Sequence, residues 1–442
     1  MKKIIIVLAA FVCVQCGQNK TAGSRDSGGT MLEDTFRLEN ENLPKETVPA
    51  RDVASVRAEI DERLRRELLG ENSTGTLDQL SKDFLDGEID SLTYFRRKSA
   101  EPKTVGTYVD IWEYIPFFET DQYWKEKSKL ALLDERSVLR FKADDDFPKL
   151  DGATALYPVY AAFAHAVYPK DVIVTQYDQS QDGWPITFPV PPGETAQSKV
   201  YEIMQKTTVV RCSRTRDAYA LLFSDDVYVY RQYGWRPDII FCYEPSAGQR
   251  AEAAENGVSF TLTPLGCDAF VFIVHKDNPV DNLTSEQVRA IYSGEITNWK
   301  SVTGIDEEII AYQRPKDSGS QTILEQIMGD VPIMKAPTGL RPYGMAGMVE
   351  AVSDYTNYKN SIGYSFRFFT SDMVDSNEIK ILSIDGIYPS KENIQNKTYP
   401  FVQPFCAVTS GNETPNVQRF IAWMLSPQGQ ELIEKTGYTP IQ

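Results

Sequence analysis

The sequence predicts an α/β fold for the part of the chain that begins near Phe147. Short apolar runs typical of strands, such as Asp238–Phe241 and Ala269–Val274, alternate with segments of helical periodicity. Such alternation is typical of helices packed on a sheet, and 42% hydrophobic residues allow an ample core. The predicted helices span Tyr157–Val167, Arg216–Phe223, Gln249–Asn256, Thr284–Ser293, Ser320–Met328, Met345–Val352 and Asn416–Leu425.

The overall charge narrows the possible ligands. The chain has 46 Lys and Arg against 62 Asp and Glu, a formal net charge of −16. This balance disfavours binding of nucleic acid, because there is no excess of Lys and Arg to neutralise its phosphates. Local hydrogen-bond donors could still bind one small anion. The two histidines, His165 and His275, give little support for a histidine-rich metal site or a catalytic triad, and we expect both to be structural.

The N-terminus is typical of an exported protein. Two lysines precede the apolar run Ile4–Val14, which is much shorter than the roughly 20 residues of a membrane-spanning helix. Cys16 follows this run and resembles the acylated cysteine of a bacterial lipoprotein, with Cys13 as an alternative. We therefore expect a signal peptide over residues 1–16 and a mature chain anchored by lipid to a bacterial membrane, facing the periplasm or the cell exterior.

Two further segments precede the α/β part. Residues 17–50 are polar and predict a flexible tether, and residues 51–146 form an N-terminal extension that we expect to be mainly helical. The aromatic stretch Tyr108–Leu133 is compatible with a stacking platform or, as we favour, with packing against a neighbouring domain. The role of residues 17–146 is open.

Four cysteines remain after the N-terminus. None of them forms a close Cys-x-x-Cys pair, which argues against a zinc ribbon or a redox motif. An exported protein permits disulfides, but apolar neighbours are equally typical of buried free thiols. These cysteines are Cys212, Cys242, Cys267 and Cys406.

The stretch around Arg314 has the residue types of an anion-binding loop. Arg314 offers a planar, permanently charged fork. Ser318, Gly319 and Ser320 stand directly before a predicted helix, whose first N–H groups and nearby hydroxyls can bind an oxyanion. Taken alone, the pattern also fits a Ser318 that only caps the helix.

Several phrases together resemble the phosphate-binding periplasmic proteins of ABC transporters. They are Phe270–Val280, Ile291–Trp299, the Arg-x-x-x-Ser-Gly-Ser stretch, Asp151–Pro158 and Ser361–Tyr364. The resemblance covers about Phe147–Gln442. It implies a two-lobe periplasmic-binding-protein fold of type II with an interlobe cleft. Lobe 1 would comprise residues 147–273 and 399–442, and lobe 2 residues 274–398.

The resemblance also implies the rest of the site. Thr154 and the amide of Ala155 lie where the family's first loop donates to the anion, although Asp151 and Thr154 would also fit simple helix caps. Ser213 matches a second donor, with Thr215 as the reserve. The family places an Asp acceptor, which favours hydrogen phosphate over sulfate, near Glu244, and Glu244 either replaces it or caps the next helix.

The same family resemblance implies the partners. We expect one inorganic phosphate, delivered to an ABC permease and its ATPase by a monomer that needs no metal and no cofactor. Two alternatives remain. The fold could serve another oxyanion, sensing or adhesion, or, less favoured, a phosphatase could use Ser318 or Ser320 as nucleophile.

Overall fold

The computed structural model describes most of the chain after residue 110. The described residues are 111–117, 126–178, 184–190, 194, 201–336, 342, 344–353, 360–374 and 376–441. The predicted signal peptide, the tether and most of the N-terminal extension lie outside them. The chain divides into two compact units, Met1–Thr104 and Val105–Gln442, and all of the described residues belong to the second.

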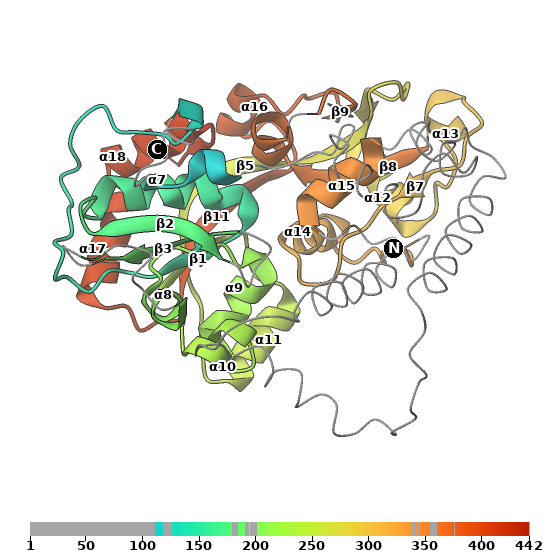
Figure 1. Ribbon diagram of the computed structural model, residues 1–442. Helices are drawn as coiled ribbons and strands as arrows, with labels where there is room; N and C mark the ends of the chain where they lie inside the picture. Colours follow the sequence, from blue (N-terminus) through green and yellow to red (C-terminus); the bar gives the residue numbers. More distant parts are fainter. Residues whose placement is uncertain are drawn as a thin grey trace, which may run out of the picture. The chain divides into compact units, whose positions relative to one another are not determined.

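An eight-stranded mixed sheet forms the framework of this unit (Figure 1). Its main order is β1-β4-β11-β5-β8-β7, and β12 and β9 also pair with β5. The strands are β1 (Leu150–Gly152), β4 (Ile239–Cys242), β5 (Thr261–His275), β7 (Ile310–Ala311), β8 (Ser361–Phe366), β9 (Ile379–Ile381), β11 (Val402–Thr409) and β12 (Thr439–Pro440). Two small ladders join β2 (Ile173–Asp178) to β3 (Trp184–Pro189) and β6 (Asn282–Leu283) to β10 (Ser383–Ile384).

Strand β5 belongs to two groups of strands. Its first part, up to Ala269, pairs with β11 and β12, whereas Phe270–His275 pairs with β8 and β9. We call β1, β4, β11 and β12 with their helices the first segment, and β7, β8 and β9 with theirs the second segment. The exchange of partners falls between Ala269 and Phe270, and the residue limits predicted for two lobes stay a prediction.

The helices of the first segment surround a largely apolar centre. Helix α7 (Tyr157–Val167) carries no Asp, Glu, Lys or Arg, and most of its residues are buried, as expected of a helix that is apolar on all sides. The others are η1 (Ile111–Tyr114), η2 (Thr154–Leu156), α8 (Tyr201–Thr207), α9 (Arg214–Phe223), α10 (Tyr228–Tyr233), α11 (Ala247–Glu255), α17 (Pro415–Met424) and α18 (Pro427–Thr436).

Two longer helices of the second segment begin at clear capping residues. Thr284 forms a capping box at the start of α12 (Ser285–Ser293), and Gly294 ends that helix in the left-handed region. Ser318 caps α14 (Gly319–Met328). The remaining elements are α13 (Lys300–Thr303), α15 (Gly344–Ser353) and the π-helix η4 (Phe369–Met373). Helix α16 (Lys391–Gln395) lies against β5 and β12.

The predicted α/β class is confirmed. All seven predicted helices coincide with observed ones to within two residues at each end, and both apolar runs lie largely in strands. Trp112, Tyr114 and Phe117 are buried, which favours packing over a stacking platform for this part of the aromatic stretch. The four cysteines are free thiols, and Cys242 and Cys406 are register neighbours on β4 and β11.

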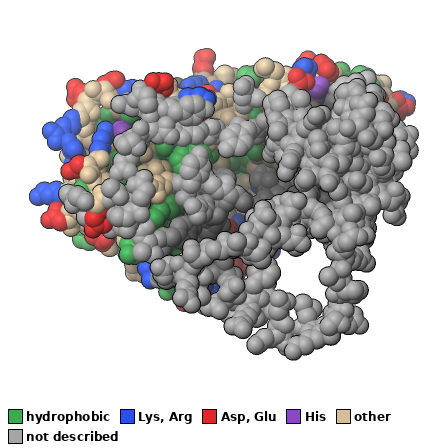
Figure 2. All heavy atoms as spheres, in the orientation of Figure 1, with side chains coloured by type: hydrophobic (Ala, Val, Ile, Leu, Met, Phe, Trp, Pro, Cys, Tyr) green, Lys and Arg blue, Asp and Glu red, His purple; other side chains and the backbone are tan. Residues whose placement is uncertain are grey.

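The described helices and the surface charges bear on whether the chain resembles membrane-spanning or nucleic-acid-binding proteins. No helix among the described residues is both long and apolar enough to cross a membrane. The face drawn in Figure 2 carries acidic and basic side chains interspersed over its described part. The described part of this face therefore shows no continuous basic field of the kind that binds nucleic acid.

Gly152 provides a test of the packing at the end of β1. A Cβ on Gly152 would lie 2.4 Å from the carbonyl oxygen of Phe241 on β4, so Gly152→Ala must displace backbone. We expect the free energy of unfolding in urea to fall by roughly 1–3 kcal/mol. Gly347→Ala is the matched control, because the nearest atom to its Cβ lies at 3.7 Å and alanine favours the helix. Equal stability of Gly152→Ala and the wild type would contradict the close approach.

Candidate functional site

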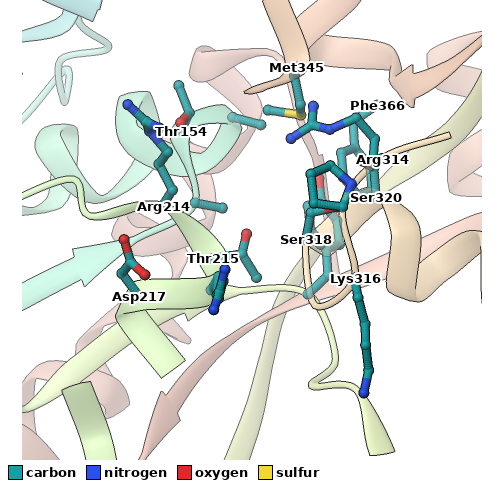
Figure 3. A pocket seen from close by; sticks show the side chains of 16 residues that line it. Thr154, Arg214, Thr215, Asp217, Arg314, Lys316, Ser318, Ser320, Met345 and Phe366 are labelled. Atoms are coloured by element: carbon teal, nitrogen blue, oxygen red, sulfur yellow. The ribbon is translucent and has the colours of Figure 1, made fainter. Parts of the chain in front are cut away.

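A cavity of about 120 Å³ lies between the two segments (Figure 3). Residues of η2, α9 and the end of β4 line one side, and residues around the start of α14 line the other. The first segment contributes Ala153, Thr154, Ala155, Arg214, Thr215, Arg216, Asp217 and Tyr243. The second contributes Arg314, Pro315, Lys316, Ser318, Gly319, Ser320, Met345 and Phe366.

The loop after β1 is held against β4. The amide of Ala153 donates to the carbonyl of Phe241 over 2.9 Å, and η2 begins at the next residue and leads into α7. Thr154 and Ala155 occupy the first turn, where backbone N–H groups have no acceptor within the helix. The loop thus offers a hydroxyl and N–H donors to the cavity.

A buried carboxylate ties this loop to the start of α9. Oδ1 of Asp151 accepts from the amide of Gly152 over 2.8 Å and from the amide of Ser213 over 2.6 Å. Burial raises the pKa of Asp151 to about 6, although these amides, the Ser213 hydroxyl and the Arg211 charge favour its ionised form. Asp151 therefore positions the chain at Ser213 without facing the cavity.

The backbone turns sharply just after Ser213. Arg214 has a φ of 71°, a left-handed conformation that is uncommon for residues other than glycine. The four residues that follow Ser213 line the cavity. Asp217 is the one carboxylate among the described lining residues; burial raises its pKa, and the charges of Arg216 and Arg214 partly counteract this.

The loop before α14 is anchored through its backbone. The amide of Arg314 donates to the Tyr364 hydroxyl over 2.7 Å and to Oε1 of Gln321 over 3.0 Å. The Ser318 hydroxyl accepts from the amide of Gln321 over 3.3 Å, so Ser318 caps the helix and still has its own hydrogen to donate. Gly319 and Ser320 form the first turn, whose N–H groups have no acceptor within the helix.

Gly319 permits the close approach of the two sides. A Cβ at this position would lie 3.0 Å from Oγ1 of Thr215 on α9. Figure 3 shows Ser318, Ser320 and Arg314 on one side of the cavity and Thr215 on the other. The starts of two helices therefore meet at one point from opposite segments.

The structure brings most of the predicted site residues together. Thr154, Ala155, Arg314, Ser318, Gly319 and Ser320 all line the cavity. Ser213 does not line it, because its amide bonds Asp151 and the turn at Arg214 presents Thr215, the reserve candidate, instead. That these residues bind a ligand stays a prediction.

Glu244 lies outside the cavity. Its side chain is 51% exposed, with a carboxylate oxygen 3.7 Å from the Arg250 guanidinium. Successive side chains alternate in direction along extended backbone, and here Tyr243 is the residue that lines the cavity. Tyr243 also stacks on Phe366 of β8, with ring centroids 3.7 Å apart and an interplanar angle of 2°. Glu244 therefore is not among the residues that line this cavity, and its role as acceptor stays a prediction.

Our sequence interpretation missed Asp217, Tyr243, Met345 and Phe366, and it did not include Arg214 and Arg216 in the site. The run Arg214–Asp217 at a helix start was the available signal for the charged members. The apolar members come from strand ends and from α15, which no local motif connects to the site.

The arrangement suits a tetrahedral oxyanion. It combines hydroxyls, N–H groups at two helix starts and guanidinium groups. The described residues contain no group of three or more His, Cys, Asp or Glu that could hold a metal ion. The hydroxyls, N–H groups and guanidinium groups that line the cavity can hold an anion by hydrogen bonds and charge.

The titration of Asp151 can be tested by unfolding at different pH values. Because its folded pKa lies above the ordinary 3.8, ionisation on going from pH 4 to pH 6 removes stability. Asp151→Asn keeps an oxygen that accepts from both amides and does not ionise. We expect the free energy of unfolding of the wild type to fall by roughly 2–3 kcal/mol in this pH window because of Asp151. The variant should not show this fall. Identical pH profiles of the two proteins would contradict the raised pKa.

Comparison with known sequences identifies related proteins. The model of the PBP superfamily domain matches residues 196–428, more than half of the chain. The phosphate-binding protein PstS of Borreliella burgdorferi is 29% identical over 197 residues, 43% of this chain and 69% of that protein. PstS of Bacillus subtilis is 27% identical over 175 residues, 38% of this chain and 53% of its own length. The chain thus spans about half to two-thirds of these relatives.

Solved structures of similar proteins were also found. The ABC-type phosphate transport receptor from Vibrio cholerae is 22% identical, covers 66% of this chain and 99% of its own, and has a TM-score of 0.44. PstS from Borrelia burgdorferi is 21% identical, covers 67% of this chain and all of its own, and has a TM-score of 0.38.

Proposed function

Because the chain belongs to the PBP superfamily, we propose that it is an extracytoplasmic solute-binding protein that captures inorganic phosphate and delivers it to an ABC permease with its ATPase. The family match and the curated relatives confirm the resemblance that the sequence motifs indicate. Relatives named as phosphate-binding proteins support phosphate as the ligand.

One observation carries the choice of ligand. The starts of η2 and α14 face a single cavity from opposite segments, next to the buried guanidinium of Arg314, which is 8% exposed. Hydroxyls and N–H groups are neutral donors, so they bind the oxygens of an anion without requiring many positive charges in the site. A guanidinium adds a charge-assisted bond in a partly water-excluded site. We propose Thr154, Ala155, Arg314, Ser318, Gly319 and Ser320 as the phosphate ligands, with Thr215 in place of Ser213.

We propose that the acceptor role expected of Glu244 belongs to Asp217. A carboxylate in the site accepts the proton of hydrogen phosphate and repels sulfate, which has no proton to offer. Asp217 lines the cavity, whereas Glu244 is directed to solvent beside Arg250. Burial raises the pKa of Asp217, and the charges of the neighbouring Arg216 and Arg214 counteract this in part by favouring its ionised form.

Capture without hydrolysis fits the cavity better than phosphatase activity. A serine nucleophile needs an adjacent base. His165 and His275 are not among the described lining residues; His165 lies at the end of α7, and His275 ends β5. Asp217, the lining carboxylate, comes from α9 in the opposite segment to Ser318 and Ser320.

The proposal includes the cellular setting that the N-terminus predicts. Export by a signal peptide and a lipid anchor at Cys16 would hold a monomer at a bacterial membrane, near its permease. Service to another oxyanion, sensing or adhesion are the competing functions. Calorimetric titrations with phosphate, sulfate and molybdate distinguish the competing anions.

Removal of Arg314 tests the ligand set. We expect the wild type to bind one phosphate and Arg314→Ala to bind it tenfold to a hundredfold more weakly by calorimetry, because a charge-assisted bond contributes about 1.5–3 kcal/mol. Arg419→Ala on α17 is the matched control, since Arg419 contacts Asn416 and does not line the cavity. A wild type that binds sulfate or molybdate but no phosphate would overturn the function, and equal affinities of Arg314→Ala and the wild type would overturn the role of Arg314.

A pair of carboxylate variants tests the acceptor. We expect Asp217→Asn to lose about tenfold of the preference for phosphate over sulfate, because a neutral amide no longer repels the ionised oxygen. Glu244→Gln should keep the wild-type preference. Competitive titrations of the two anions measure both, and a loss confined to Glu244→Gln would return the role to Glu244.

A further inference from the structure

A hydrogen bond joins the two segments beside the cavity. The Ser246 hydroxyl donates to Oδ1 of Asp317 over 2.7 Å. Ser246 follows β4 in the first segment, and Asp317 belongs to the loop before α14 in the second. Neither residue is among the described lining residues of the cavity. The bond therefore connects the segments without being part of the proposed ligand set.

Ser246 is held in a fixed orientation. It is 4% exposed and caps α11, where its hydroxyl accepts from the amide of Gln249 over 3.0 Å. Its own amide donates to Oε1 of Gln249 over 2.9 Å, which completes a capping box. Because the Ser246 oxygen accepts from the amide of Gln249, its hydroxyl hydrogen is donated to Asp317.

Asp317 is placed by an unusual backbone conformation. Its φ is 63°, which is uncommon for a residue other than glycine but tolerated by Asp. Its carboxylate lies at the start of α11, 3.5 Å from where a Cβ on Gly248 would stand. The partial positive charge at the start of a nine-residue helix favours a carboxylate there.

This contact borders the proposed ligand site. Asp317 directly precedes Ser318, and Gly319 packs closely against Thr215 of the first segment. A fixed Asp317 therefore restricts the direction of the Ser318 hydroxyl and of the N–H group at Gly319. The two inter-segment contacts lie on either side of Ser318 in the sequence.

We propose that the Ser246–Asp317 hydrogen bond is a latch that keeps the segments closed on the bound anion, and that Asp317 is a positioning residue for Ser318. This inference rests on the proposed phosphate-binding function. When the segments move apart, the Asp317 carboxylate and the Ser246 hydroxyl form hydrogen bonds with water instead of with each other. The bond therefore stabilises the closed, occupied state and slows release of the anion.

Glycine substitutions remove the latch with little other damage. Ser246→Gly deletes the hydroxyl, and glycine still serves well as a helix cap. Asp317→Gly deletes the carboxylate, and glycine accepts the positive φ. Ser246→Thr is the matched control, because it keeps both the hydroxyl and the cap. A fourth variant carries both glycine substitutions.

Stopped-flow measurement of phosphate dissociation provides the readout. We expect each glycine variant to release phosphate about tenfold faster than the wild type, with association rates within about twofold. The double variant should release it no faster than the single variants, because both changes remove the same bond. Ser246→Thr should behave like the wild type. A purely structural role of Ser246 would change stability without this non-additive effect on release.

The outcomes separate the latch from the proposed function. If phosphate binds and the two substitutions are additive or without effect on release, the latch is overturned and the proposed function stands. If the wild type does not bind phosphate, the proposed function fails. Urea unfolding of the wild type, the two single glycine variants and the double variant then tests the bond between the segments by itself: coupled free energies retain this bond, and additive ones overturn it.

Discussion

Strand β5 is the constraint on which both halves of the site depend. Its 15 residues pair first with β11 and then with β8, so the same strand is built into both segments (Figure 1). The end of β4, next to β11, positions Tyr243, and β8 positions Phe366 and Tyr364. Because the two segments share their central strand, the loops at the starts of η2, α9 and α14 converge on one cavity.

The charge around the cavity differs from the net charge of the chain. The chain has a formal charge of −16, yet the cavity gathers Arg214, Arg216 and Arg314 around helix N-termini and hydroxyls. The preorganised donors can therefore attract a small anion locally, while the net negative charge disfavours polyanions. The buried Asp151 serves this organisation indirectly, since it fixes the backbone that turns Thr215 and Asp217 toward the cavity.

Local sequence signals predicted the elements that local physics determines. Helix α7, apolar on all sides, and helix α14, capped by Ser318, were predicted nearly to the residue. The short helices α8, α10 and α13 were not predicted, because such helices depend on tertiary contacts more than on periodicity. The sequence did not reveal the left-handed turn at Arg214, which brings Thr215 to the cavity instead of Ser213. For Glu244, a shift of one residue at the end of a strand decides which side chain faces the cavity, and that residue is Tyr243.

The central claim is that one phosphate contacts both segments at once, through the starts of η2 and α14. Hydrogen exchange of the backbone amides, with and without phosphate, tests this directly. We predict that phosphate slows exchange in residues 154–156 and 319–321 together, because the anion accepts from both helix starts. Slowed exchange in only one of these stretches, or in neither, would contradict the account.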